Sequence, residues 1–239
     1  MGEAFGIYDL GADEALMEHV SLANVACGFH AGDPAVMRRT VRSARAHGVR
    51  VGAHPSYPDL QGFGRRAMAM EREELAASIV YQVGALKGFL DAAGMELSHI
   101  KPHGALYGAA ARDEEVAHAV ADAAEVFGVP VMGMAGTLHE RVYTGRGLGF
   151  LAEYYVDLDY DDDGGLLITR KHVAYDPGEA ARRVERVVRD GVALSASGKE
   201  IPMRADCVCV HSDTPGAADL ARAVADTLRR LEGDADGQA

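Results

Sequence analysis

The chain has 239 residues, of which 48% are hydrophobic and 25% are charged, and its formal net charge is −12 at pH 7. This length and apolar content are sufficient for one domain with a buried core. The negative charge argues against nucleic acid or an anionic membrane as the main partner. We therefore expect the partner to be a small metabolite or another protein.

The sequence contains no apolar stretch as long as a membrane span. Residues 1–5 lack the basic start and the apolar segment of a signal peptide. The cysteines are Cys27, Cys207 and Cys209, an odd number with two of them in a Cys-x-Cys pattern. This usage predicts reduced thiols and a cytoplasmic location.

Hydrophobic periodicity and capping signals predict alternating strands and helices from the beginning of the chain. Asp33 and Pro34, for example, supply the N-cap and the first residue of an amphipathic helix. In chain order, the first half is expected to form a helix from Asp13, a strand at 22–29, a helix at 34–47, a strand at 49–53, a loop at 56–66, a helix at 71–93 and a strand at 97–102.

The second half continues this alternation. Asp176, with Glu179 three residues later, is a capping-box arrangement that predicts the start of a helix. The expected elements are a helix at 113–127, strands at 129–135 and 150–159, an acidic turn at 161–165, a strand at 166–169, a helix at 176–190, a strand at 207–210 and a helix from Thr214 through Leu231. Residues 233–239 are expected to be a disordered tail.

Strands that alternate with helices of a dozen or more residues indicate βα units and a parallel sheet. The chain has neither the glycine-rich dinucleotide motif after a strand nor the lysine-containing phosphate loop. Those two nucleotide-binding folds are therefore disfavoured. The sequence predicts an α/β fold in which residues 1–239 form a single β/α-barrel domain, and no linker marks a second one.

Four of the predicted strands run into a histidine: His30, His54, His103 and His211. The carboxyl ends of barrel strands open on one face, so we expect these side chains to converge there. Side chains alternate along a strand, which places further polar residues on the same faces. These are Asn24 before His30, Lys101 before His103 and Asp213 after His211.

Such a cluster has three possible chemical uses. The imidazoles and a carboxylate could hold zinc or another divalent ion and leave one position open for water. They could instead act as general acid and base at a carbonyl group, or they could orient a polar ligand. The sequence has no His-x-x-x-His or Cys-x-x-Cys metal motif, and the three uses stay open.

Basic side chains and helix ends near the histidines favour an anionic substrate. Arg65 and Arg66 could clamp a carboxylate or a phosphate. The helices that begin after Asp33 and at Thr214 would direct unpaired backbone amides into the same mouth. The acidic run from Asp157 to Asp163 is interpreted as a solvated turn.

Four long segments of the chain, ANVACGFHAGDPAVM, GVRVGAHPSYPDLQGFGRR, HIKPHGALY and CVCVHSDTPGA, resemble the LamB/YcsF family. Members of this family serve as the A subunit of bacterial ATP-dependent 5-oxoprolinase. The resemblance covers nearly the whole chain. It implies an irregular, seven-stranded β/α barrel of the glycoside hydrolase and polysaccharide deacetylase kind.

The resemblance also implies a reaction and its participants. The complex, formed with the B and C subunits of 5-oxoprolinase, would open the lactam of 5-oxo-L-proline to give L-glutamate, coupled to hydrolysis of ATP to ADP and phosphate. ATP would then be a co-substrate that is bound mainly by the partner proteins, because this chain lacks a nucleotide motif. Whether a divalent metal takes part stays open, with His30, His54 and His103 as its ligands if it does.

The expected site residues follow from the motifs and the resemblance together. One imidazole would act as general base toward water or would protonate the lactam nitrogen. The expected catalytic residues are His30, His54, His103, Lys101, His211 and Asp213. The expected substrate contacts are Asn24, Asp33, Arg65 and Arg66.

Two features depart from the family pattern. Members usually begin with a strand resembling Asp-Leu-Asn-x-Asp-x-Gly-Glu, whereas this chain starts at Met1-Gly2-Glu3. We therefore expect the first barrel strand to be missing or truncated. Relatives often carry Phe-Ala-Asp-Arg followed by Tyr where this chain has Glu153 in place of the arginine, so the preferred lactam could differ from 5-oxoproline.

Two other functions are compatible with the sequence. The first is a metal-dependent amidohydrolase or deacetylase that acts alone, which stoichiometric zinc and ATP-independent hydrolysis would reveal. The second is a non-catalytic subunit that binds a lactam and presents it to its partners. In that case, histidine variants would leave the activity of the complex unchanged.

Overall fold

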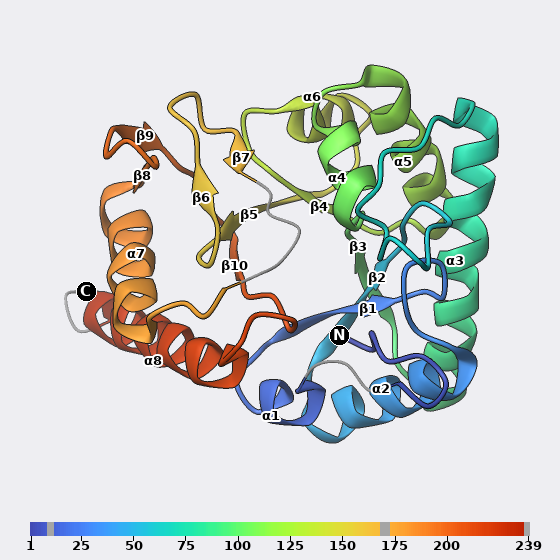
Figure 1. The fold of residues 1–239 in the computed structure, drawn as a ribbon, viewed down its shortest axis with the longest axis horizontal. Helices are drawn as coiled ribbons and strands as arrows, with labels where there is room; N and C mark the ends of the chain where they lie inside the picture. The colour runs from blue at the N-terminus through green and yellow to red at the C-terminus, as the bar shows by residue number, and fades with distance from the viewer. Residues whose placement is uncertain (9–11, 168–172, 237–239) are drawn as a thin grey trace.

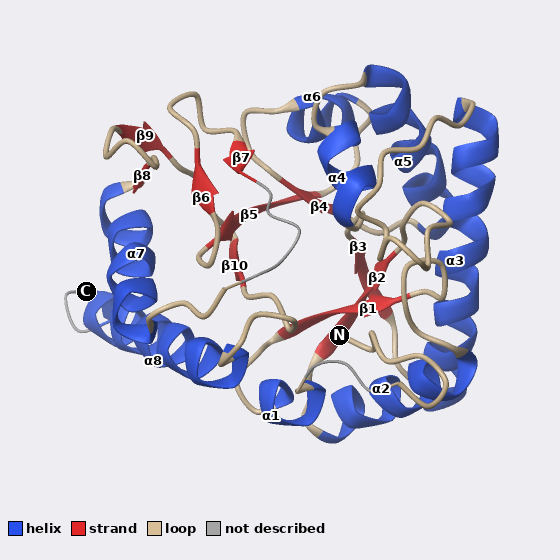
Figure 2. Cartoon of the chain, viewed as in Figure 1, coloured by secondary structure: helices blue, strands red, loops and turns tan. Residues whose placement is uncertain are grey.

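The computed structural model describes residues 1–8, 12–167 and 173–236. At its centre is a six-stranded sheet in which every neighbouring pair is parallel. The sheet curls into a half-barrel, and helices cover its outer side (Figures 1 and 2). In spatial order, its strands are β1 (Leu22–Ala26), β2 (Arg50–His54), β3 (Leu97–Ile100), β4 (Val131–Gly133), β5 (Phe150–Tyr155) and β10 (Cys207–Cys209). This confirms the predicted parallel β/α architecture.

The helices begin and end where local signals place them. The carboxylates of Asp33, Asp113 and Asp176 accept hydrogen bonds from backbone amides in the first turns of three helices. Gly94 ends one helix in the left-handed conformation, with a φ of 65°. The described helices are α1 (Asp13–Met17), α2 (Pro34–Ala46), α3 (Arg72–Ala93), α4 (Gly104–Ala110), α5 (Glu114–Phe127), α6 (Leu138–Gly145), α7 (Pro177–Asp190) and α8 (Ala217–Asp236).

Several elements differ from the sequence predictions. Helices α4 and α6 and the hairpin of β8 (Val192–Leu194) with β9 (Glu200–Pro202) were not predicted, because they are too short to show a clear period. The predicted strand at 150–159 is divided into β5 and β6 (Asp159–Tyr160). Strand β6 pairs with β7 (Leu166–Leu167), whereas residues 168 and 169 of the predicted partner strand lie outside the described residues. Helix α8 continues to Asp236, past the point where a disordered tail was predicted.

The barrel is not closed in the part of the chain that the structure describes. No described strand pairs with both β1 and β10, which form the two edges of the sheet. Met1 lies along the edge of β1, where its amino group donates to the Asn24 carbonyl (2.9 Å) and its carbonyl accepts from the Ala26 amide (3.0 Å). The predicted seven-stranded closure is therefore not confirmed, and the inside of the half-barrel stays accessible.

The core lies between the sheet and the surrounding helices. Val51, Ile79, Leu86, Ile100 and Val131 are fully buried there, in one continuous cluster. A second cluster packs β5 and β6 against α7 and α8. Burial of each large apolar side chain contributes about 1.5–3 kcal/mol to the stability of the fold. This packing holds the strands that carry the site in place.

Two expectations about environment can also be compared with the structure. Cys27, Cys207 and Cys209 are free cysteines, in agreement with the predicted reduced thiols. None of the helices in the described ranges has the length and apolarity needed to cross a membrane.

Candidate functional site

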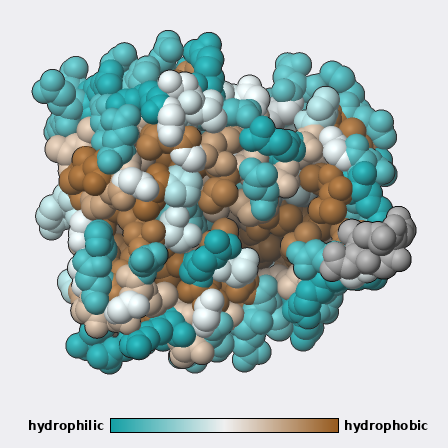
Figure 3. Space-filling model, turned by 180° about the vertical axis from the view of Figure 1, so that it is seen from behind, coloured by the Kyte–Doolittle hydropathy of each residue, from teal (hydrophilic) through white to brown (hydrophobic). Residues whose placement is uncertain are grey.

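A cavity of about 620 Å³ occupies the inside of the half-barrel. It is bounded by residues at the carboxyl ends of the strands, such as His103, and by residues near their amino ends, such as Ser21 and Cys207. On the face turned away from the viewer in Figure 1, apolar side chains are exposed in hollows between polar ones (Figure 3). Of the predicted site residues, seven line this cavity: Asn24, His54, Arg65, Lys101, His103, His211 and Asp213.

Three of the predicted histidines form one compact cluster. The rings of His30 and His103 are stacked, with centroids 3.8 Å apart and an interplanar angle of 5°. His54 stands edge-on to both, with centroid distances of 4.8 Å to His103 and 5.6 Å to His30. The predicted convergence is confirmed for these three, and His211 lies on another wall of the same cavity.

The loop between β2 and α3 covers this cluster. Phe63 has a φ of 55°, in the left-handed region that non-glycine residues seldom adopt, and its carbonyl lies 2.8 Å from Nε2 of His103. A Cβ atom on Gly64 would lie 2.8 Å from the His103 ring and 2.9 Å from Cβ of His30. Glycine at this position therefore allows the loop backbone to close over the imidazoles.

A chain of polar contacts runs through two of the rings. Nε2 of His103 faces the Phe63 carbonyl, Nδ1 of His103 lies 3.1 Å from Nε2 of His54, and Nδ1 of His54 lies 2.7 Å from the Lys101 carbonyl. Both terminal groups are carbonyls that can only accept, so two neutral imidazoles can supply protons for only two of these three contacts. One additional proton would complete the chain.

The surroundings keep both of these rings neutral. Burial, followed by the neighbouring imidazole charges, lowers the pKa of His54 and His103 well below the usual value. With neutral rings, one contact in the chain brings two lone pairs together. The contact between the two rings becomes a hydrogen bond only when the pair holds one additional proton, and the lowered pKa values oppose that proton.

Glu3 joins the cluster, although the sequence reasoning did not select it. Its Oε1 lies 3.5 Å from Nε2 of His30, and its Oε2 accepts a hydrogen bond from the Ser212 hydroxyl at 2.9 Å. Burial alone would raise the pKa of Glu3, but the amino group of Met1 and then His30 outweigh it and hold the pKa well below its usual range. The sequence did offer a signal for Glu3. Gly2 and Glu3 match the Gly-Glu pair that ends the first-strand motif of the family.

The metal hypothesis can be tested on this geometry. Glu3, His30 and His103 offer ligand atoms that all lie within 4.8 Å of one another. His30 is 1% exposed, and neither of its ring nitrogens has a hydrogen-bond partner among the described residues. However, the nitrogen lone pairs of stacked rings lie in two separate parallel planes, so they do not meet at one ion. The trio, like the predicted set with His54, does not fit a shared metal without rotation of a ring.

Asp157 holds His211 in a fixed orientation. One carboxylate oxygen accepts from Nδ1 of His211 at 2.9 Å, and the other accepts from the His211 amide and the Thr214 hydroxyl, both at 3.0 Å. A neutral imidazole that donates from Nδ1 carries its lone pair on Nε2, as a general base requires. Asp157 is buried, so its assignment to a solvated turn was wrong. The missed signal was the two-residue spacing from the buried Tyr155, which places the Asp157 side chain on the same side of the chain.

The carboxyl group of Asp157 should make stability depend on pH. Burial alone would raise the pKa of Asp157, but the hydrogen bond and charge of His211 outweigh it and lower the pKa to about 2. A depressed folded-state pKa stabilises the protein above the unfolded pKa of about 4, and this contribution is lost as the pH falls toward 2. The stabilisation amounts to about 2 kcal/mol.

We expect Asp157→Asn to be less stable than the wild type by about 2 kcal/mol at pH 5. The difference should shrink as the pH falls from 4 toward 2. Urea denaturation at a series of pH values measures it. Asp163→Asn is the control, because Asp163 is exposed. A wild-type advantage that stays constant over this range would show that the ionised Asp157 carboxylate is not its source.

Lys101 forms a buried ion pair inside the half-barrel. Its ammonium lies 2.5 Å from Oε2 of Glu153 and 3.2 Å from Sγ of Cys209, and it lies over the Tyr155 ring at 4.8 Å. Burial opposes its charge, but Cys209 and Glu153 outweigh burial and raise the pKa of Lys101. Lys101 is thus held as the cation of a buried ion pair. Glu153 is its counter-ion.

The two predicted arginines lie in different surroundings. Arg65 donates to a carboxylate oxygen of Asp213 at 2.8 Å, and its guanidinium lies over the Phe63 ring at the cavity mouth. Arg66 pairs with the buried Asp59 and is 58% exposed, outside the cavity. Arg66 therefore stabilises the loop, and Arg65 is the arginine that the structure brings to the cavity.

The two remaining predicted contacts, Asp33 and Asn24, differ in their relation to the cavity. The carboxylate of Asp33 caps α2 and also accepts from the Gly6 amide at 2.8 Å, and Asp33 does not line the cavity. The Asp33 carboxylate accepts hydrogen bonds from the backbone amides in the first turn of α2, which were expected to bind an anion. Asn24 does line the cavity, and its side-chain oxygen lies 2.7 Å from Nε2 of the buried His99.

The comparisons with known proteins agree over the whole chain. The model of the LamB/YcsF family matches residues 1–236. The lactam utilization protein lamB of Emericella nidulans is 46% identical over 224 residues, which are 92% of this chain and 88% of that protein. The A subunit of 5-oxoprolinase from Chloroflexus aggregans is 48% identical over 227 residues, which are 93% and 90% of the two chains.

A solved structure is similar as well. The crystal structure of the lactam utilization protein from Thermus thermophilus superposes with a TM-score of 0.90 at 44% identity, covering 97% of this chain and 94% of that chain. The family match, the sequence identities and the superposition all extend across the half-barrel and its cavity. The chain belongs to the LamB/YcsF family.

Proposed function

We propose that this chain is the A subunit of an ATP-dependent 5-oxoprolinase and acts on 5-oxoproline or a closely related lactam. The observation that carries the proposal is its similarity, over nearly the full length, to proteins named as the A subunit of 5-oxoprolinase or as lactam utilization proteins. The cavity supports it, because basic, acidic and imidazole groups surround a space large enough for a small cyclic amide.

The geometry suggests how the work is divided in this reaction. His211, held through Nδ1 by Asp157, is placed to take a proton from the attacking water. His54 and His103 both line the cavity, and their facing nitrogens, 3.1 Å apart, can share one proton beside the substrate. Arg65 at the mouth supplies positive charge for the substrate carboxylate.

ATP enters this proposal as a co-substrate bound mainly by the B and C subunits. Its hydrolysis supplies the free energy to open an unstrained lactam. The chain's own residues would hold the lactam and move protons as the carbon–nitrogen bond breaks: water provides the hydroxyl for the new carboxylate, and the nitrogen leaves as an amine after it gains a proton.

The decisive experiment combines the purified chain with the B and C subunits and measures glutamate formed from 5-oxoproline. We expect turnover only when all three proteins and ATP are present, with about one phosphate released for each glutamate. Glutamate formation without this chain would refute the proposal. Equal turnover by complexes in which both His54 and His103 are alanine would reduce the chain to a lactam-binding subunit.

The same preparation tests the metal-dependent hydrolase. Elemental analysis of the purified chain, together with hydrolysis assays without ATP and partners, measures the two properties that this alternative requires. Stoichiometric zinc with ATP-independent hydrolysis of an amide would favour it. The stacked arrangement of His30 and His103 leads us to expect neither.

A further inference from the structure

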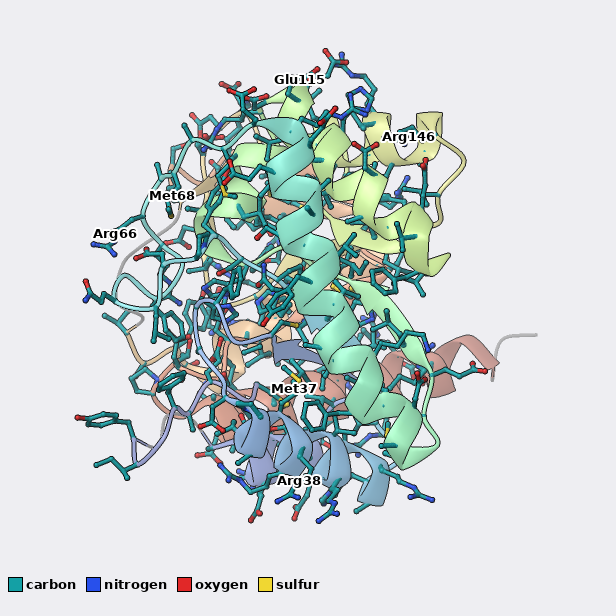
Figure 4. The ribbon with its side chains drawn as sticks, turned by 90° about the vertical axis from the view of Figure 1, so that its right-hand side faces the viewer. Met37, Arg38, Arg66, Met68, Glu115 and Arg146 are labelled. Atoms are coloured by element: carbon teal, nitrogen blue, oxygen red, sulfur yellow. The ribbon has the colours of Figure 1, made fainter. Side chains whose placement is uncertain are left out.

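The outer face of helix α2 is strongly basic. Arg38, Arg39, Arg42 and Arg45 are all exposed on it, whereas Val36, Met37 and Val41 are buried against the sheet. Figure 4 shows Arg38 directed away from the body of the molecule and Met37 on its inner side. Residues three and four apart share a helix face, so Arg38, Arg42 and Arg45 form one continuous stripe.

Among the residues that the structure describes, no ion pair neutralises these arginines. None of the four forms an ion pair with a carboxylate in the described ranges. Every other arginine of those ranges except Arg50 and Arg112 does form one. In a chain with a net charge of −12, four such cations on one short helix are an uneven distribution of charge. Such a patch attracts an acidic surface.

An exposed apolar turn lies beside this face. Phe5 and Tyr8 close a four-residue turn through two backbone hydrogen bonds of 2.9 Å, and Ile7 and Tyr8 are 93% and 71% exposed at its tip. The Gly6 amide donates to Asp33, the cap of α2, and the Gly32 amide donates to the Ala4 carbonyl at 3.1 Å. These bonds hold the turn against the beginning of α2, at the same corner of the molecule in Figures 1 and 4.

We propose that the α2 surface, defined as Phe5, Ile7, Tyr8, Arg38, Arg39 and Arg42, docks a partner protein with an apolar pocket rimmed by carboxylates. An aromatic and aliphatic tip within a charged surround has the composition of a protein–protein contact. The negatively charged backbone of a nucleic acid would match the arginines but would leave Ile7 without a pocket. This inference rests on the proposed function, which makes the B or the C subunit the partner.

The α2 surface is separate from the residues that carry the proposed chemistry. None of its members lines the cavity in the half-barrel, so a partner can dock there without entering the cavity. Association guided by complementary charges is fast at low salt and slows as salt screens the attraction. The apolar tip supplies contact area that salt does not weaken.

The test compares two triple variants with the same change in net charge. Arg38, Arg39 and Arg42 are changed to Glu in the first variant, and Arg141, Arg182 and Arg222 in the second. The second set is also exposed and lies away from the cavity. Circular dichroism confirms folding, and biolayer interferometry measures association with the purified B and C subunits at several salt concentrations.

We expect the first variant to associate about 10- to 1000-fold more slowly at low salt and to lose the salt dependence seen in the wild type. The second variant should behave as the wild type does. A double variant, Ile7→Ser with Tyr8→Ser, should dissociate at least about 10-fold faster while its salt dependence is retained. Because this double variant leaves the net charge unchanged, an effect of charge on folding cannot account for its result.

The outcomes separate the two proposals. If the wild type does not bind the B and C subunits at all, the proposed function fails. If it binds them and the first triple variant binds equally well, the α2 surface is not the docking site. Light scattering that shows a wild-type dimer broken by the triple variant, or binding of a 20-nucleotide duplex lost in that variant, would likewise overturn the assignment to one of these partner proteins.

Discussion

Replacing His103 with asparagine should lower ATP-dependent 5-oxoproline turnover by about 10²- to 10⁴-fold, the usual contribution of a positioned acid–base group. His103 links the Phe63 carbonyl to His54 and stacks on His30, so it contacts both of the other imidazoles. Asparagine retains one amide donor but cannot accept and release a proton near neutral pH. Glutamate formation by the complex with the B and C subunits measures the effect.

His139→Asn is the matched control for this prediction. His139 is also fully buried, but its ring nitrogens contact only the Tyr107 carbonyl (3.0 Å) and the Met134 amide (3.1 Å), and it does not line the cavity. Both variants should unfold at lower temperatures, because each disturbs a buried polar group. Only His103→Asn should lose turnover when both are assayed well below their melting temperatures. Turnover within about threefold of the wild type would show that the His54–His103 pair is structural.

Replacing Lys101 with methionine should destabilise the protein by about 3–5 kcal/mol, the cost of leaving one member of a buried ion pair uncompensated. Lys101, directly after β3, pairs with Glu153 of β5 across the inside of the half-barrel, and both are nearly inaccessible to solvent. For a chain of this length, the loss corresponds to a decrease in melting temperature of about 6–20 °C. Differential scanning calorimetry measures it directly.

The control for this prediction removes both charges. In the double variant Lys101→Met with Glu153→Gln, no ion remains unpaired, and most of the lost stability should return. Lys87→Met provides a second reference, because Lys87 pairs with Asp91 on the exposed surface, where an ion pair contributes about 0–1 kcal/mol. A double variant as unstable as Lys101→Met would show that packing of the lysine stem, and not the buried charge, is responsible.

Local signals were sufficient for most of the fold. The helices at α2, α3, α5 and α7 begin within one residue of their predicted starts, since their caps and apolar stripes are properties of neighbouring residues. The short helices α4 and α6 were missed because one or two turns show too little periodicity. The position of the β10 edge relative to the β1 edge could not be predicted, because the curvature of a sheet depends on all of its strands together.

The sequence predicted which residues gather at the site better than it predicted what each of them does there. Histidines at the ends of parallel strands must share one edge of the sheet, so the convergence of His30, His54 and His103 followed from topology. Contacts such as Asp157 with His211, or Asp33 with Gly6, join residues that no spacing rule relates. They decide which carboxylate faces the cavity and which one only caps a helix.

The sequence by itself therefore determined the parallel β/α architecture, the family and the strand ends on which the imidazoles lie, because these depend on periodicity, caps and motifs within short segments. Only the tertiary structure decided that the rings of His30 and His103 stack face to face, and that Lys101 is held as a cation by Glu153. Ring orientation and the field at a buried charge depend on atoms supplied by several strands and loops at once. Such relationships exist only after the chain has folded.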